Sequence, residues 1–162
     1  MFRFETDRSL IESFRSRDRR VIEMPPGVTF PFFVRDYLAW TETSGARVYL
    51  IFTAPSSRKP IGIIFRRDSP GGGLTSSMCE WCHSYGSSSE VGLLTTDADS
   101  KRRVGVHLCL DLRCKEKLED QADRLGRHPR EALDLLRERM FRFAHEALGI
   151  EAHPEGYGAR PG

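Results

Sequence analysis

Two stretches decide how this chain is interpreted: Met78-Cys79-Glu80-Trp81-Cys82-His83 and Leu108-Cys109-Leu110-Asp111-Leu112-Arg113-Cys114-Lys115. They contain all four cysteines of the 162 residues, as two close pairs with 26 residues between them. Such spacing is typical of one tetrahedral zinc site, because each pair can bring two thiolates to the same ion. The sequence therefore predicts a structural Zn²⁺, one per chain, bound by Cys79, Cys82, Cys109 and Cys114.

Other interpretations of the cysteines are weaker. The run from Cys79 to His83 also fits the attachment pattern of a c-type haem, but that chemistry needs export and leaves the second pair unused. A redox Cys-x-x-Cys pair is disfavoured because the second pair already completes a metal site. His83 and His107 are possible substitute ligands, but with four cysteines available we expect exposed or hydrogen-bonded histidines. Four thiolates around Zn²⁺ carry net negative charge, which Arg113 and Lys115 could offset.

Composition and charge place the chain among soluble globular proteins, with 39% apolar and 30% charged residues and a net charge of +2. So small a net charge argues against a strong polyanion binder. The first residues show no signal-peptide pattern, and no stretch approaches the roughly 18 apolar residues of a membrane helix. We therefore expect a cytoplasmic protein with one domain at residues 1–150 and a disordered tail at residues 151–162.

Hydrophobic patterning predicts an α+β fold of antiparallel β-hairpins with a Cys₄ treble-clef zinc finger and C-terminal helices. Asp7 and Asp111 are candidate caps of the first two helices. The order of cysteine turn, hairpin and second cysteine pair at a helix start is that of a treble clef. The expected strands lie near 47–53, 61–67, 91–96 and 102–108, and the expected helices near 8–16, 114–125 and 129–148.

Catalysis finds little support in the residues. Paired carboxylates, a Gly-x-Ser-x-Gly elbow and a His-Glu-x-x-His helix are all missing from the sequence. His128 precedes a proline in an expected turn, and His145 has no evident partner on the last helix. A non-catalytic binding module is therefore favoured over an enzyme. On that last helix, Leu135 and Phe141 fall outside the expected core face and could touch a partner.

From these motifs the chain resembles the C-terminal treble-clef domain of elongation factor G-binding proteins, the fusidic-acid-resistance protein family. The matching features are the Cys-x-x-Cys turn, the hairpin ending at residues 105–109, the gap to Cys114 and the long helix that follows. An aromatic segment at residues 33–40 also fits, so the resemblance covers roughly residues 8–148. Resistance-type members carry an additional N-terminal helical domain, and we expect this chain to correspond to the form without it.

The resemblance implies that the zinc domain binds elongation factor G and promotes its release from the ribosome. We expect the contact face at the cysteine turn and adjoining hairpin, because Trp, Tyr and Arg dominate binding energetics. Trp81 could instead only shield the zinc from water. The alternative function is binding of ribosomal RNA or other nucleic acid, for which residues 101–142 offer 12 Lys or Arg against 8 Asp or Glu. The expected contact residues are Trp81, Tyr85, Arg102, Arg103 and Lys115.

Overall fold

The computed structural model of this chain describes residues 1–55, 57–67 and 76–151. It confirms the predicted α+β class. The predicted disordered tail lies, from residue 152 on, outside the described residues. The elements in chain order are β1 (Phe2–Phe4), α1 (Asp7–Glu12), the 3₁₀ helix η1 (Ser16–Val21), β2 (Phe32–Val34), β3 (Tyr37–Thr41), β4 (Arg47–Thr53), β5 (Pro60–Arg67), β6 (Ser77–Met78), β7 (Tyr85–Gly86), β8 (Val91–Asp97), β9 (Arg103–Cys109), α2 (Cys114–Arg124) and α3 (Arg130–Leu148).

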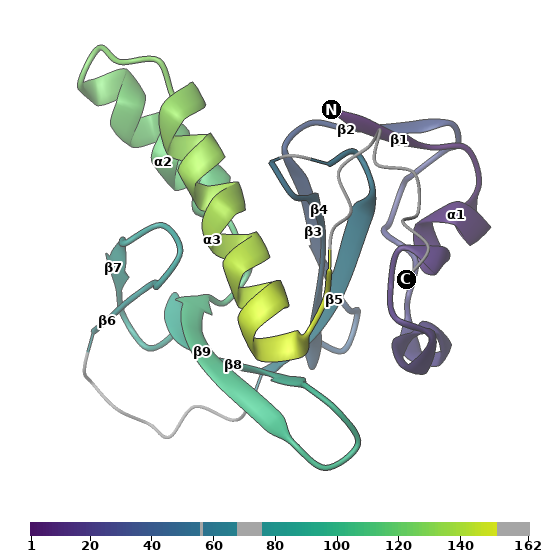
Figure 1. The fold of residues 1–162 in the computed structure, drawn as a ribbon. Helices are drawn as coiled ribbons and strands as arrows, with labels where there is room; N and C mark the ends of the chain where they lie inside the picture. The colour runs from purple at the N-terminus through teal and green to yellow at the C-terminus, as the bar shows by residue number, and fades with distance from the viewer. Residues whose placement is uncertain (56, 68–75, 152–162) are drawn as a thin grey trace, which may run out of the picture.

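The central sheet is antiparallel, with strand order β3-β4-β5-β8-β9. Both predicted hairpins are confirmed, β4 with β5 and β8 with β9. Within the described residues, the two hairpins join where Arg66 pairs with Thr95 and Arg67 with Leu94. Because this junction is short, the β8–β9 hairpin extends away from the other three strands (Figure 1). Two further small sheets, β1-β2 and β6-β7, flank the central one.

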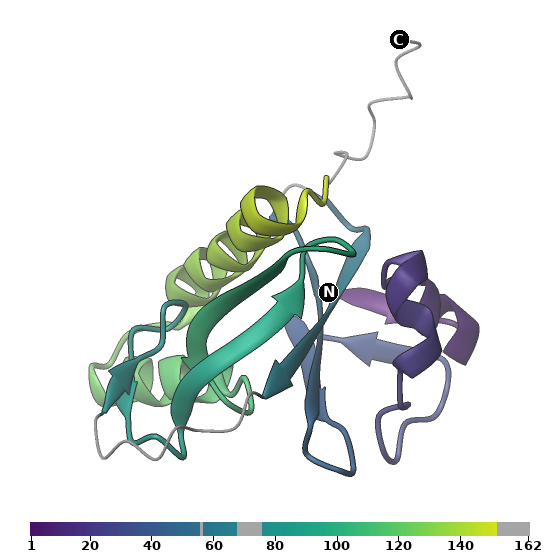
Figure 2. The ribbon, with the colours of Figure 1, turned by 90° about the horizontal axis from the view of Figure 1, so that it is seen from below.

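Side chains of β4 alternate between two hydrophobic cores. Val48, Leu50 and Phe52 enter the core that contains the four cysteines and α3, which we call the zinc-side core. Tyr49 and Ile51 enter the core formed with α1, β1 and β2, which we call the N-terminal core. Successive residues of a strand point to opposite faces, and both faces are covered here (Figures 1 and 2). This explains why the whole strand is apolar rather than alternating.

The N-terminal core is built mainly from aromatic rings. Trp40 stacks on Tyr49 with ring centroids 5.0 Å apart, and Phe14 meets both rings edge-on. Phe14 also lies directly against Gly62 of β5, where an added Cβ would come within 2.6 Å of the ring. Glycine is thus required at this position by close packing rather than by backbone conformation.

The first helix differs from its prediction in both length and cap. It ends at Glu12, and Thr6 rather than Asp7 is the N-cap, with a reciprocal pair of hydrogen bonds between Thr6 and Ser9. Asp7 occupies the first turn, where its charge still favours the helix. The charged run at residues 17–20 lies in the largely exposed 3₁₀ helix η1.

The two C-terminal helices lie close to their predicted ranges. Arg113 is the N-cap of α2 and makes no side-chain cap bond, so the prediction that Asp111 caps this helix is wrong. Asp111 Oδ1 instead accepts a hydrogen bond from the Arg113 N–H. Gly149 ends α3 in the left-handed conformation, with φ +67°, which glycine adopts without steric cost. No helix in the described ranges is long and apolar enough to cross a membrane.

Candidate metal centre

The first cysteine pair sits in a tight turn between β6 and β7. Cys79 N–H donates to the Ser84 carbonyl at 2.9 Å, and His83 N–H donates to the Cys79 carbonyl at 2.8 Å. His83 closes this turn in the left-handed region, with φ +62°. The turn is tied to β9 because Glu80 N–H donates to the His107 carbonyl and Glu80 Oε2 accepts from His107 N–H. Backbone bonds therefore fix this turn, which we call the knuckle, against the second hairpin.

The second cysteine pair joins the end of β9 to the start of α2. Cys109 is the last residue of β9 and Cys114 the first of α2. Between them, buried Leu112 adopts φ +55° and its N–H donates to the Cys109 carbonyl. Tyr37 clamps this connection, because its hydroxyl donates to the Leu112 carbonyl and accepts from Lys115 N–H. Burial raises the pKa of Tyr37 well above its ordinary value, so the phenol keeps the proton that it donates.

The four cysteines converge on one point. All four Sγ atoms lie within 4.8 Å of one another and the side chains are buried. Cys79 Sγ is 3.7 Å from Cys114 Sγ, and Cys82 Sγ is 3.6 Å from Cys109 Sγ. Zinc–sulfur bonds of about 2.3 Å place neighbouring sulfurs of a regular tetrahedron about 3.8 Å apart. The sulfur positions and the all-thiolate donor set therefore fit one Zn²⁺, which would bind all four cysteines.

Hydrogen bonding among the sulfurs divides the thiols into two kinds. Hydrogen bonds from Cys109 and Cys114 lower the pKa of Cys79 to about 7, and Cys109 also lowers the pKa of Cys82. The pKa of Cys114 is raised, first by its contact with Cys109. Four sulfurs this close cannot all carry negative charge unless a cation lies between them. The cluster is thus a cation site by its chemistry as well as by its shape, and when bound, zinc would supply cross-linking rather than an open coordination position.

Lys117 is the cation that contacts the sulfurs. Its Nζ lies 3.2 Å from Cys109 Sγ. Burial lowers the pKa of Lys117, but the hydrogen bond that it donates to Cys109, together with the electrostatic attraction of the clustered cysteines, outweighs burial, so the pKa is raised overall. The sequence pointed to Arg113 and Lys115 for this role. Lys117 could have been found by helical spacing, since it lies three residues after Cys114 and therefore on the same side of α2.

Lys115 instead belongs to an ion cluster around the buried carboxylate of Asp36. Its Nζ lies 3.4 Å from Asp36 Oδ2, while Arg130 binds the other oxygen of the same carboxylate. Burial raises the pKa of Asp36, but the hydrogen bond and charge of Arg130, together with Lys115, hold it below its ordinary value. Asp36 precedes β3, so this cluster ties the starts of α2 and α3 to the sheet. No sequence motif marks it, because the three residues are brought together only by the fold.

The histidines that were considered as substitute ligands lie outside the sulfur cluster. His83 and His107 are both exposed, and only cysteines make up the one group of potential metal ligands found among the described residues. His83 serves the knuckle through its backbone, and His107 through its bonds with Glu80.

Of the expected contact residues, Trp81 is buried, with 3% of its surface exposed. Its ring packs between Phe65 of β5 and Phe143 of α3, each with a centroid distance of 5.9 Å. The Trp81 carbonyl accepts from Arg139 Nη1 at 2.7 Å. Core packing covers this indole, so it presents little surface to a partner. Trp81 belongs to the apolar wall beside the sulfurs.

The remaining expected contact residues do not share one face. Tyr85 stands on the knuckle strand β7 and is 73% exposed. Arg102 and Arg103 are exposed at the far end of the β8–β9 hairpin, where Arg103 pairs with Asp97. Cys109 ends the same strand six residues later, which corresponds to about 20 Å along β9. The structure therefore leaves Tyr85 at the knuckle and places the two arginines at a separate site.

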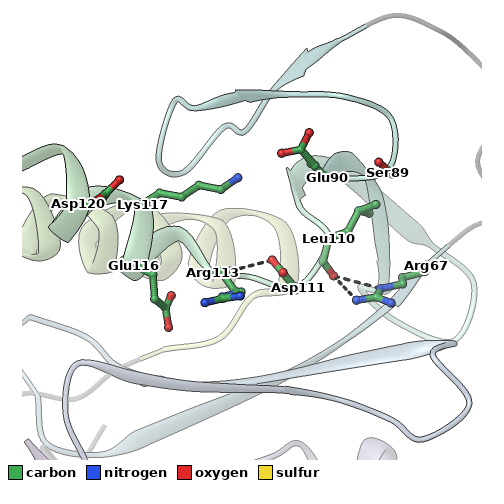
Figure 3. Close-up of a pocket in the computed structure, with 9 residues that line it drawn as sticks. All are labelled: Arg67, Ser89, Glu90, Leu110, Asp111, Arg113, Glu116, Lys117 and Asp120. Atoms are coloured by element: carbon green, nitrogen blue, oxygen red, sulfur yellow. Dashed lines mark hydrogen bonds between the residues drawn. The ribbon is translucent and has the colours of Figure 1, made fainter.

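Two hollows lie beside the metal centre. One, of about 660 Å³, is lined by Tyr85, by Leu118 of α2 and by Leu135 and Arg139 of α3, and we call it the knuckle groove. The other, of about 630 Å³, lies near the start of α2 (Figure 3). There Arg67 donates two hydrogen bonds to the Leu110 carbonyl, which fixes the turn before Cys114 (Figure 3). Both hollows include Lys117, so they meet over the cation that contacts Cys109.

Comparison with known proteins agrees with this geometry. A family model described as the FBP C-terminal treble-clef zinc-finger matches residues 5–149. A solved structure described as that of the fusidic acid resistance protein FusC superposes with a TM-score of 0.51 at 18% identity. The aligned region covers 77% of this chain and 56% of that one, so the chain spans little more than half the length of that protein. No curated protein matches the sequence.

Proposed function

The chain belongs to the FBP C-terminal treble-clef zinc-finger family, and from this premise we propose that it is a non-catalytic zinc protein that binds elongation factor G and modulates its release from the ribosome. The partner comes from the family resemblance of the sequence motifs. The observation that carries a binding role is the convergence of four buried thiols within 4.8 Å. A zinc ion held by four thiolates has no open position for water or substrate, so its contribution is to rigidity.

The knuckle groove is the surface that we propose for the partner. Tyr85 projects from a turn that backbone hydrogen bonds hold in place, so little conformational freedom is lost when it binds. Leu135, at 43% exposure, offers an apolar group from α3 in the same groove, and Arg139 is held there by the Trp81 carbonyl. An exposed aromatic beside apolar and arginine side chains has the composition of a binding hot spot. Trp81 supports this surface from beneath, and Lys115, Arg102 and Arg103 are not part of it.

The test is calorimetric titration of the zinc-loaded protein into elongation factor G. Replacing Tyr85→Ala should weaken binding by about 1–3 kcal/mol, as for a hot-spot aromatic. The matched control is Phe33→Ala, which removes another aromatic ring, 57% exposed, from β2 on the N-terminal side. Binding by the native chain that Tyr85→Ala weakens and Phe33→Ala does not would support the proposal. Absence of binding by folded, zinc-loaded protein would overturn it, and equal loss in both variants would overturn the proposed surface.

The proposed effect on the ribosome has its own assay. Elongation factor G is trapped on ribosomes with GTP and fusidic acid, the chain is added, and the factor remaining on pelleted ribosomes is measured. We expect the bound fraction to fall with added protein and the Tyr85→Ala variant to need a higher concentration. An unchanged bound fraction, despite binding of the free factor, would contradict the release role while leaving the interaction intact.

The proposal treats residues 1–150 as one elongation factor G-binding-type zinc domain. Its support is that the two cores share β4 and β5, whose side chains alternate between them. Limited proteolysis of the zinc-loaded protein should therefore release one resistant fragment ending near residue 150. Separate resistant fragments for the N-terminal and zinc-side regions would contradict a single domain.

A further inference from the structure

A basic surface forms where η1 meets the tip of the β8–β9 hairpin. Arg15 joins these distant segments, because its guanidinium donates to the Asp97 carbonyl at 2.6 Å and to the Ala98 carbonyl at 3.1 Å. The two segments lie side by side in both ribbon views (Figures 1 and 2). We call the surface made by residues 15–20, Arg66 and residues 97–103 the basic ridge.

Charge is concentrated on this ridge. It contains eight Lys or Arg and three Asp, a net charge of +5, whereas the whole chain carries +2. The rest of the chain therefore carries −3, and the molecule is strongly asymmetric in charge. Two further acids, Glu12 and Glu151, line a small hollow beside Arg15 and Arg19, together with Lys59. Even with these three residues included, the surface keeps an excess of four cations.

The acids of the ridge are already engaged. Asp18 pairs with Arg15 at 2.9 Å, and Asp97 pairs with both Arg66 and Arg103. Asp99 accepts the backbone N–H groups of Lys101 and Arg102, each at 2.8 Å. All three acids of the ridge are therefore engaged by groups within the ridge itself.

Four cations of the ridge are left without such partners. The side chains of Arg17, Arg20, Lys101 and Arg102 are exposed, and no hydrogen bond or ion pair engages them within the described part of the chain. The pKa of Asp99 is lowered, mainly by the hydrogen bond from Lys101 N–H. The charges of Arg102 and Arg17 lower it further, so both arginines act on the same carboxylate. The free cations of η1 and of the hairpin tip are therefore neighbours, although more than 80 residues separate them in the sequence.

From this arrangement we propose that the basic ridge binds the phosphate backbone of a nucleic-acid duplex. Unpaired Arg and Lys side chains gathered on one surface neutralise successive phosphates and release counterions. The ridge has no aromatic residue, so it offers no platform for stacking of unpaired bases. Contact is thus with the backbone and independent of base sequence. This inference does not rest on elongation factor binding, which uses the knuckle groove.

The experiment measures fluorescence anisotropy of labelled 24-base-pair duplexes, one of RNA and one of DNA with the same sequence, with zinc-loaded protein. The test variant is R17Q/K101Q/R102Q. The matched control, R35Q/R127Q/R142Q, removes three exposed arginines elsewhere and changes net charge equally. For the native chain we expect affinity to fall steeply between 50 and 200 mM salt. The test variant should bind about tenfold or more weakly at low salt, and its salt slope should be smaller by about three.

Each outcome has a definite meaning. Preference for the RNA or the DNA duplex identifies the source of the phosphates and supports the ridge equally. Native protein that binds neither duplex with salt dependence overturns the proposal, and so does an equal loss in the control variant. If the test variant binds both duplexes normally but loses elongation factor G, the ridge is a protein interface and the proposal is wrong. Unchanged zinc content and thermal melting of the test variant establish that it is folded.

Discussion

The zinc-side core and the N-terminal core lie on opposite faces of the same two strands, β4 and β5, yet different interactions stabilise them. The zinc-side core surrounds four thiols with mostly aliphatic groups from β8, β9 and α3. The N-terminal core has no cysteine and relies on aromatic rings, among them Phe4, Phe14, Trp40 and Tyr49. The zinc-side core can be stabilised by metal–sulfur bonds, whose energy does not depend on buried area. The N-terminal core is stabilised only by burial and packing of its side chains.

This difference implies different responses to mutation. A metal site fails when one ligand is lost, because the remaining three no longer satisfy the ion. A packed core loses stability in proportion to the atoms removed and to the cavity left behind. Since β4 and β5 supply alternate residues to both cores, a strongly destabilising substitution in one core should also destabilise the other.

The largest effect is expected from Cys79→Ser. The variant should bring bound zinc from one per chain to near zero and lower the free energy of unfolding by more than about 5 kcal/mol, because structural zinc contributes folding energy directly. Metal analysis and thermal melting measure both. His83→Asn is the matched control in the same turn, since His83 is exposed and asparagine tolerates a positive φ. Retention of zinc by Cys79→Ser would show that the four cysteines do not act as one site.

The next pair of variants compares the cores directly. Trp81→Ala and Phe14→Ala each remove a buried ring and should each cost about 3–5 kcal/mol in denaturant unfolding. Only Trp81→Ala should speed the transfer of zinc to a competing chelator, because its ring packs beside the sulfurs whereas Phe14 lies across the sheet. Equal acceleration in both variants would show that the two cores open together.

The same contrast separates what the sequence predicts well from what it does not. The spacing of four cysteines is local chemistry, and the apolar runs of β4, β5, β8 and β9 are short, rich in β-branched or aromatic residues and bounded by turn residues, so these elements and the metal centre were predictable. The start of the chain was predicted less well. There β1, β2 and β3 are short. Trp40 donates a hydrogen bond to the Glu23 carbonyl, just after η1, and Tyr49 donates one to the Val21 carbonyl at the end of η1, contacts that only the fold creates.

Within the metal centre, the sequence is least informative where burial decides the role of a side chain. Trp81 stands beside two ligands in the sequence, and nothing local indicates that Phe65 and Phe143 will cover it. Lys115 and Lys117 are two residues apart on one helix and so point in different directions. Lys115 contacts Asp36 and Lys117 contacts Cys109. Which lysine contacts which partner depends on how α2 packs against the sheet.

An intermediate loss of stability is expected when the ion cluster of Asp36, Lys115 and Arg130, which joins the central sheet to α2 and α3, is broken. Asp36→Asn keeps a side chain that tolerates φ +67° but leaves Lys115 and Arg130 without their anion. Breaking such a cluster should cost about 2–3 kcal/mol, less than for a fully buried pair because both cations are partly exposed. Chemical denaturation at neutral pH measures this.

The same variant should change the dependence of stability on pH. The pKa of Asp36 is lowered in the folded protein, so its stabilisation is present above the unfolded carboxyl pKa, near 4, and is lost as pH falls through the folded value. Native protein should therefore lose part of its stability below about pH 4, and Asp36→Asn should lose less over that range. Parallel pH profiles would contradict the assignment.

A smaller effect tests the packing of the N-terminal core. Gly62→Ala would place a Cβ within 2.6 Å of the Phe14 ring, and we expect a cost of about 1–3 kcal/mol from overpacking. In a Phe14→Leu background the clash is partly relieved, so the same substitution should cost less. The difference is measured as a double-mutant cycle. Additive costs would show that the ring is not what excludes a side chain at this position, and zinc content should stay constant throughout.

The smallest expected change concerns the cation beside the sulfurs and isolates electrostatics from packing on the zinc side. Lys117→Met keeps the length and apolar stem of the side chain but removes the charge 3.2 Å from Cys109 Sγ. A cation hydrogen-bonded to a thiolate ligand stabilises the negative charge that four thiolates leave on the metal centre, and loss of such an outer partner typically weakens metal binding 10–100-fold. Because Lys117 is partly exposed and water can replace part of its effect, we expect about tenfold weaker zinc affinity in a chelator competition. Lys117→Arg should restore most of it, and Lys101→Met, far along the hairpin, should change nothing. Unchanged affinity in Lys117→Met would mean that backbone N–H groups such as that of Cys82, 3.5 Å from Cys79 Sγ, suffice to stabilise the thiolates.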